Sequence, residues 1–304
     1  MREAFSTALV NFALNDPRIL LLTGDHGYAL FDEFRAKCSQ QYINAGIAEQ
    51  NMVGMAAGLA RVGYRPFVYG LAAFIPVRTL EQIKLDIAHD DLPVVLLGDG
   101  AGFVYSHLGT SHQSTEDIAC TRSIPGLQVL SPADRFEMRA CMEYALESRS
   151  PVYLRMGKSD RGDVHQAPID TLQGGELLQL RSGRSDRPGL ISTGSMVTTA
   201  VEVATRLDLN VWSAPVLKPL AHEAIKVAAQ VSRCLVTLEE HSILGGLGAA
   251  VAEILSEVHP MRLLRLGVQD RFSEHCGTHT YLLQEHGLDY STVVAKIEAF
   301  CDAC

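Results

Sequence analysis

Apolar residues in the first half of the chain follow two alternating spacings. Short continuous runs, such as 19–22 and 93–97, are typical of strands that are buried on both faces. Between the runs, apolar positions recur at helical spacing, as in 48–61 and 77–89. For residues 1–157 we therefore predict a mostly parallel sheet that is covered by helices.

A polar stretch interrupts this pattern before it resumes. Residues 158–187 are rich in charged and turn-forming residues, which indicates a linker. Strand-like and helical segments then alternate again from 189–193 to 262–266. The predicted fold class is α/β, with two doubly wound domains at 1–157 and 188–304 that share no internal repeat.

Composition and charge narrow the classes of function. The 304 residues carry a net charge of −9, which argues against nucleic acid or a membrane surface as a partner. No apolar run approaches the ~20 residues that a membrane span needs, and no signal peptide is recognisable. Seven cysteines at irregular spacings indicate reduced thiols and a cytoplasmic protein. Cys301 and Cys304 have C-x-x-C spacing, but their place at the chain end favours a frayed terminus over a metal or redox site.

Two motifs have an ordinary structural interpretation beside a chemical one. Gly98, Asp99 and Gly100 are similar to the start of a diphosphate-binding motif, but no Asn follows before Asn210 to complete its metal ligands, so we predict a turn and no metal site. Glu49 begins a strongly apolar helix. On its own it is either an acid that the helix dipole favours or a buried carboxylate that needs a partner.

Segments of both predicted domains resemble the transketolase superfamily of thiamine diphosphate enzymes. In the first domain they match the pyrimidine-binding domain, and in the second the transketolase C-terminal domain. The segments are 46–68, 72–88, 109–134, 190–204, LEEH at 238–241 and GVQD at 267–270. A full-length transketolase has a diphosphate-binding domain ahead of these two.

The resemblance implies the C-terminal subunit of a split transketolase, which transfers a two-carbon ketol or related unit. The cofactor would be thiamine diphosphate, with Mg²⁺ or Ca²⁺ held by a partner subunit that carries the diphosphate-binding domain. Two-fold symmetry would give an α₂β₂ assembly.

The resemblance also assigns roles to single residues. Glu49 matches the glutamate that hydrogen-bonds the aminopyrimidine ring and so activates the cofactor. Phe74 matches the aromatic residue on the pyrimidine, and Asp25 an acid near the thiazolium. His112 matches a histidine that touches substrate oxygens. His26, beside Asp25, is expected to face substrate.

Two basic residues keep two interpretations each. Arg78 faces the cofactor pocket or forms an ion pair with Glu81 on the helix surface. Lys158 aligns with an arginine that binds substrate phosphate in deoxyxylulose-phosphate synthases, or it is a solvated charge of the linker. Departures at Ala29 and Leu108, where relatives carry serine and aspartate, predict an altered donor or acceptor.

Three other functions compete with a split transketolase. A β subunit of a 2-oxoacid dehydrogenase has the same pair of domains, although LEEH and GVQD look like transketolase. A fragment of a deoxyxylulose-phosphate synthase is a weaker choice. A non-catalytic scaffold with this fold would be free to lose Glu49, Phe74 and His112, yet the chain has all three.

Overall fold

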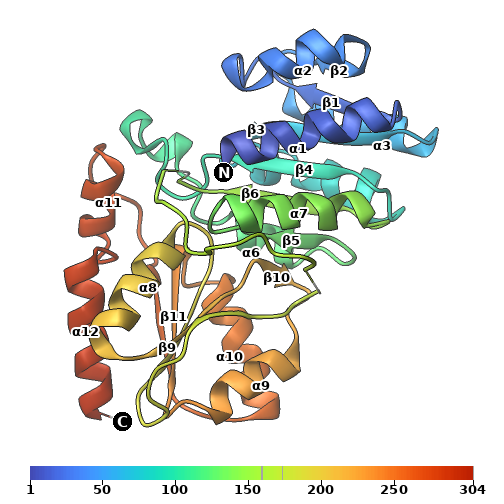
Figure 1. The fold of residues 1–304 in the computed structure, drawn as a ribbon. Coiled ribbons are helices and arrows are strands. Elements are labelled where there is room, and N and C mark those ends of the chain that lie inside the picture. Colours follow the sequence, from blue (N-terminus) through green and yellow to red (C-terminus); the bar gives the residue numbers. More distant parts are fainter. Residues whose placement is uncertain (159, 173, 304) are drawn as a thin grey trace.

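The computed structural model describes residues 1–158, 160–172 and 174–303. The chain forms two α/β units that lie against each other, with the first half of the sequence in one and most of the second half in the other (Figure 1). Cys304 lies outside the described residues, so the structure does not test the interpretation of the terminal C-x-x-C spacing.

The first unit is built on a sheet with the strand order β10-β5-β6-β4-β3-β1-β2, seven strands within the described part of the chain. All neighbours are parallel except β10, which runs antiparallel to β5. The strands are β1 (Ile19–Thr23), β2 (Tyr42–Asn44), β3 (Arg65–Leu71), β4 (Val95–Asp99), β5 (Gln128–Leu130), β6 (Val152–Met156) and β10 (Val216–Lys218).

Alternate residues of the central strands supply two separate cores. Ile19 and Leu21 of β1 pack in one hydrophobic cluster with α1 (Arg2–Asn15) and α7 (Arg135–Glu147). Leu20 and Leu22 pack in another with α3 (Glu49–Arg61). Both faces of the sheet are therefore buried, which explains the continuous apolar runs in the sequence.

The remaining helical segments of this unit are η1 (Ala29–Phe31), α2 (Asp32–Lys37), η2 (Ser39–Gln41), α4 (Ile75–Arg78), α5 (Leu80–Gln82), η3 (Ile83–Ala88), η4 (Ser106–Leu108), η5 (Thr110–His112) and α6 (Asp117–Arg122).

The second unit has a sheet with the order β12-β11-β8-β9-β7, five strands among the described residues. Only its edge strand β7 is antiparallel. Its strands are β7 (Leu178–Arg181), β8 (Gly189–Ser192), β9 (Asn210–Ser213), β11 (Leu235–Ser242) and β12 (Leu263–Val268), and its helices are α8 (Met196–Leu207), α9 (His222–Gln230), α10 (Leu247–Val258), α11 (His279–Glu285) and α12 (Tyr290–Ala303).

The predicted α/β class with two mostly parallel sheets is confirmed. Two strands do not follow the expected division into a first domain, a linker and a second domain. Strand β7 lies inside the stretch 158–187, and strand β10 of the second half completes the sheet of the first unit. The domain limits at 157 and 188 stay predictions. None of the described helices is long and apolar enough to cross a membrane.

Candidate active site

The predicted site residues follow different strands of the first sheet but share one edge. Asp25 comes after β1, Glu49 after β2, Phe74 after β3, His112 after β4 and Lys158 after β6. These strands are parallel, so their carboxyl ends meet at the same edge of the sheet. Ligands of open α/β sheets bind outside this edge.

Glu49 is buried at the first turn of α3, where its side chain has a charged partner. Its carboxylate is 4% exposed and lies 2.8 Å from Nη1 of Arg78, whose side chain is 45% exposed. Gln50 Nε2 donates to the carbonyl of Arg78 at 3.2 Å, which joins α3 to the end of α4 a second time. Arg78 therefore directs its guanidinium to Glu49. Its place in a cofactor pocket stays a prediction.

Phe74 connects this ion pair to His112. The guanidinium carbon of Arg78 lies 4.2 Å from the centre of the Phe74 ring. The ring of His112 also meets Phe74 edge to face, with 5.2 Å between the ring centres. Glu49, Arg78, Phe74 and His112 thus form one continuous cluster from three separate segments of the chain.

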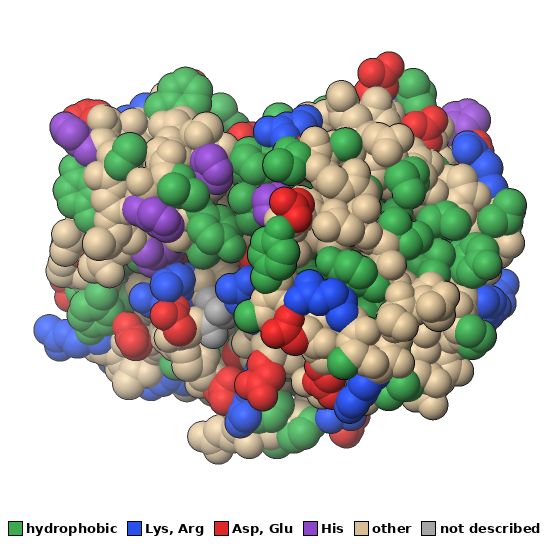
Figure 2. Space-filling model, turned by 90° about the horizontal axis from the view of Figure 1, so that it is seen from above, with side chains coloured by type: hydrophobic (Ala, Val, Ile, Leu, Met, Phe, Trp, Pro, Cys, Tyr) green, Lys and Arg blue, Asp and Glu red, His purple; other side chains and the backbone are tan. Residues whose placement is uncertain are grey.

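Apolar side chains are exposed in the loops that carry this cluster. Ile47 is 76% exposed, Val77 41% and Leu108 51%. A view of the whole molecule from above shows hydrophobic side chains open to solvent in several places and most of the visible histidines on one side (Figure 2). Where exposed apolar side chains form one contiguous patch, they mark a surface that another chain covers.

Asp25 and His26 occupy a tight turn next to the loop that leads to Glu49. Asp25 has φ +60°, and its backbone N–H donates to Asn44 Oδ1 at 3.3 Å. The hydroxyl of Tyr28 donates to the Asp25 carboxylate. Nε2 of His26 is buried and has no hydrogen-bond partner among the described residues. Among the described residues, no hydrogen bond or ion pair joins Asp25 or His26 to Glu49 or Phe74.

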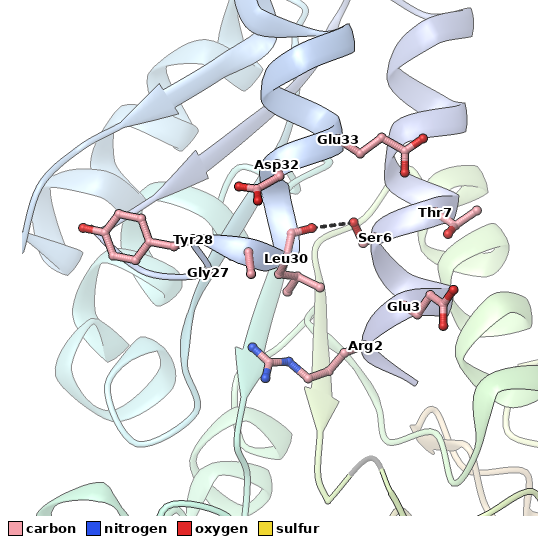
Figure 3. A pocket seen from close by; sticks show the side chains of 10 residues that line it. Arg2, Glu3, Ser6, Thr7, Gly27, Tyr28, Leu30, Asp32 and Glu33 are labelled. Carbon is pink, nitrogen blue, oxygen red and sulfur yellow. Dashed lines mark hydrogen bonds between the residues drawn. The ribbon is translucent and has the colours of Figure 1, made fainter.

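An open pocket of about 640 Å³ lies between α1 and the segment 27–33, which follows this turn in the chain (Figure 3). Arg2, Ser6, Tyr28 and Asp32 are among its lining residues, and Ser6 Oγ donates to the carbonyl of Leu30 at 2.7 Å. Glu49, Phe74 and His112 do not line it. This pocket is therefore separate from the cluster.

Lys158 lies at the same edge of the sheet but is engaged locally. Its Nζ is 3.0 Å from Oδ2 of Asp160, and its side chain is 33% exposed. The hydrogen bond from Lys158 is the main cause that lowers the pKa of the Asp160 carboxyl. The charge of His279, in the second unit, lowers it further. Lys158 thus lies close to the boundary between the two units.

Sequence reasoning missed a buried polar network behind the site. Arg155, 1% exposed, pairs with Asp117 at 2.8 Å and donates to the carbonyl of Glu240 at 2.7 Å. Burial raises the pKa of Glu239 to about 7 and lowers that of His241 to about 4. The LEEH motif, with two adjacent carboxylates after an apolar run, was the signal in the sequence for this network.

Metal ligands were not expected in this chain. In residues 1–158, 160–172 and 174–303, no group of three or more His, Cys, Asp or Glu side chains is arranged to hold a metal ion.

Comparisons with known proteins agree with both units of the fold. Residues 1–162 match the family model "Transketolase, pyrimidine binding domain", and residues 181–293 match "Transketolase, C-terminal domain". The chain therefore belongs to the transketolase family, and the resemblance seen in the sequence is confirmed.

Individual relatives are similar over most of their length. The chain is 34% identical over 294 residues to a subunit of the apulose-4-phosphate transketolase of Phocaeicola vulgatus, a match that covers 95% of this chain and 93% of that protein. It is 33% identical to a 6-deoxy-6-sulfo-D-fructose transketolase subunit of a Clostridium species, over 97% and 92% of the two chains. Among solved structures, "Split gene transketolase, inactive beta4 tetramer" matches with a TM-score of 0.88 at 36% identity, over 98% and 96% of the two chains.

Proposed function

We propose that the chain is the C-terminal subunit of a split, thiamine-diphosphate-dependent transketolase. It would transfer a two-carbon ketol unit from a ketose-type donor to an aldehyde-type acceptor in the cytoplasm. Two of its relatives are named as transketolase subunits, which supports a partner that carries the diphosphate-binding domain and the Mg²⁺ or Ca²⁺ site.

The observation that carries this proposal is the arrangement of Glu49 and Phe74. Between them lies a planar group with N–H donors, the Arg78 guanidinium, which bonds the carboxylate and covers the ring. An aminopyrimidine is also planar and also offers hydrogen-bonding nitrogens along one edge. The residues present therefore fit the pyrimidine end of the cofactor.

Each residue has a distinct task in this proposal. Glu49 and Phe74 would hold the aminopyrimidine, with Arg78 and Asp25 lining the cofactor site. The buried carboxylate of Glu49 would hold a proton against the ring nitrogen, which needs a group that stays in place in a water-poor environment. When bound, thiamine diphosphate supplies a nucleophilic carbon that attacks the donor ketone.

The substrate side of the site would be formed by His112, His26 and Lys158. His112 is half-buried, and Ser111 Oγ lies 3.0 Å from its Nδ1, which leaves Nε2 to face substrate oxygens. The unpartnered Nε2 of His26 is a second group that a polar substrate would satisfy. Lys158 would exchange Asp160 for a negatively charged donor.

Exposed apolar side chains near the cluster are the basis for proposing an assembly with other chains. Ile47, Val77 and Leu108 would be covered by the partner subunit. The solved relative that is described as an inactive β₄ tetramer supports both self-association and inactivity without a partner. We propose an α₂β₂ enzyme.

Reconstitution tests this function. The chain is co-expressed with a subunit that carries the diphosphate-binding domain, and thiamine diphosphate and Mg²⁺ are added. Ketoses with and without phosphate are offered with aldose acceptors, and 2-oxoacids are offered in a parallel assay. We expect mass spectrometry to find aldoses extended by two carbons, and no product with Glu49→Gln. Decarboxylation of 2-oxoacids without ketol transfer would refute the proposal in favour of the dehydrogenase alternative.

A further inference from the structure

The loop 100–116, which carries His112, has little regular structure of its own. It contains two 3₁₀ segments of three residues each, η4 and η5. Its base is closed by Gly102 and Ser114, which exchange backbone hydrogen bonds of 2.8 and 2.9 Å. Single 3₁₀ turns make few internal hydrogen bonds. The position of His112 therefore depends on what contacts the loop from outside.

Glu240 of β11 reaches across from the second unit and binds the base of this loop. Its fully buried carboxylate accepts the backbone N–H of Phe103 at 2.6 Å, the hydroxyl of Ser195 at 2.7 Å and Nε2 of His279 at 3.0 Å. Gly102 permits the approach, because a Cβ at this position, where φ is +70°, would lie 2.3 Å from the carboxylate. Burial would raise the pKa of Glu240, but His279 and the hydrogen bonds lower it, so the carboxylate stays charged.

Ser273, in the loop before α11, binds the other end of the same loop. Its hydroxyl donates to Oε1 of Gln113 at 2.9 Å and lies 3.0 Å from Nε2 of His286. Gln113 directly follows His112 in the chain and is 7% exposed. The ring of His286 also stacks on Phe103, with 5.0 Å between the ring centres. The second unit therefore holds the loop on both sides of His112.

We propose that Glu240 and Ser273 are positioning residues for His112. They hold the loop so that the imidazole stays against Phe74 and faces the reacting group. The second domain thereby affects the rate of the reaction through the position of His112, although neither residue touches substrate. The proposal rests on the proposed function, which gives His112 its task, but the contacts of the loop can be tested separately.

Amide hydrogen exchange of the chain tests these contacts directly. Glu240→Gln removes the charge that attracts His279, and Ser273→Ala removes one hydroxyl from a surface loop without threatening the fold. In both variants we expect exchange of residues 104–113 to rise about tenfold. The matched control is Glu239→Gln, because this equally buried neighbour accepts the N–H groups of Leu247 and Gly248 at the start of α10, in its own unit.

Two results of the exchange experiment would overturn the proposal. One is exchange of residues 104–113 at the parent rate in both Glu240→Gln and Ser273→Ala. The other is an equal rise in Glu239→Gln, which would show general loosening of the second unit.

Kinetics of the reconstituted complex test the consequence for the reaction. We expect kcat to fall about tenfold in Glu240→Gln and Ser273→Ala, with the Kd of thiamine diphosphate unchanged, since a misplaced group costs rate more than cofactor binding. An unchanged kcat, or a Kd that weakens as much as kcat falls, would refute a positioning role. A parent complex without any ketol transfer would instead refute the proposed function, while the exchange rates would still decide whether the second domain holds the loop.

Discussion

Removing the charge of Arg78 should destabilise the isolated chain, because Glu49 would remain buried without a partner. Breaking a fully buried ion pair costs about 3–5 kcal/mol, whereas an exposed pair is worth at most ~1 kcal/mol. Here the carboxylate is 4% exposed but the arginine side chain is 45% exposed. For Arg78→Met we therefore expect a loss of about 1–2 kcal/mol in the free energy of unfolding.

Urea unfolding of a double-mutant cycle with Glu49→Gln isolates the pair. We expect a coupling energy of about 1 kcal/mol, so that Arg78→Met costs little once Glu49 is neutral. Arg61→Met is the control, because Arg61 makes a similar contact of 2.6 Å to Asp90 while both side chains are substantially exposed. Equal losses in Arg78→Met and Arg61→Met, with no coupling to Glu49, would refute the idea that the buried carboxylate depends on Arg78.

Three further predictions concern stability and turnover. Burial raises the pKa of Glu239 to about 7 from 4.5, so its contribution to stability is present below about pH 4.5 and lost as the pH rises through about 7. The stability of the parent relative to Glu239→Gln, measured by urea unfolding, should thus fall by about 3 kcal/mol across this range, and a constant difference would contradict the assignment. His112→Ala should lower kcat of the reconstituted enzyme at least ~100-fold while calorimetry finds the same Kd for thiamine diphosphate; equal losses would indicate a structural role. Lys158→Ala should raise KM about tenfold for phosphorylated donors alone, and an equal rise for unphosphorylated donors would leave Lys158 as a linker charge.

Elements that are buried on both sides were predictable from the sequence. Strand β9 (Asn210–Ser213) and helix α10 (Leu247–Val258) begin and end where their apolar patterns do. Glu49 stood out for the same reason, since a carboxylate at the start of an apolar helix needs either the helix terminus or a partner. The structure provides both, with Glu49 in the first turn of α3 and Arg78 beside it.

Local pattern indicated the helical segments but not their irregularities, and it could not indicate the sheet to which a short strand belongs. Residues 77–89 have helical spacing, yet the structure divides the region into α4, α5 and the π-helical η3. Thr79 interrupts it with φ −115° and ψ 21°, and its hydroxyl bonds the carbonyl of Ile75. Strand β10 is three residues long and pairs with β5, some 86 residues earlier in the chain, so no periodicity within it could indicate its sheet.

The contact between the two units was equally invisible to spacing. Phe103 and Glu240 are 137 positions apart. The sequence shows only that two adjacent glutamates follow the strand-like run 235–238, and successive residues of a strand face opposite sides. That alternation sends Glu239 to the start of α10 and Glu240 to the loop of the first unit, a division that requires the fold to be known.

Hydrogen–deuterium exchange at the reactive carbon of thiamine diphosphate tests the central claim most directly, because it measures cofactor activation without any substrate. The measurement uses the complex of this chain with a subunit that carries the diphosphate-binding domain, and it compares the parent with Glu49→Gln. Glutamine keeps the size of the side chain but loses the negative charge, so we predict exchange at least ~100-fold slower at similar cofactor occupancy. Exchange as fast in Glu49→Gln as in the parent would contradict the account of this chain as a catalytic subunit.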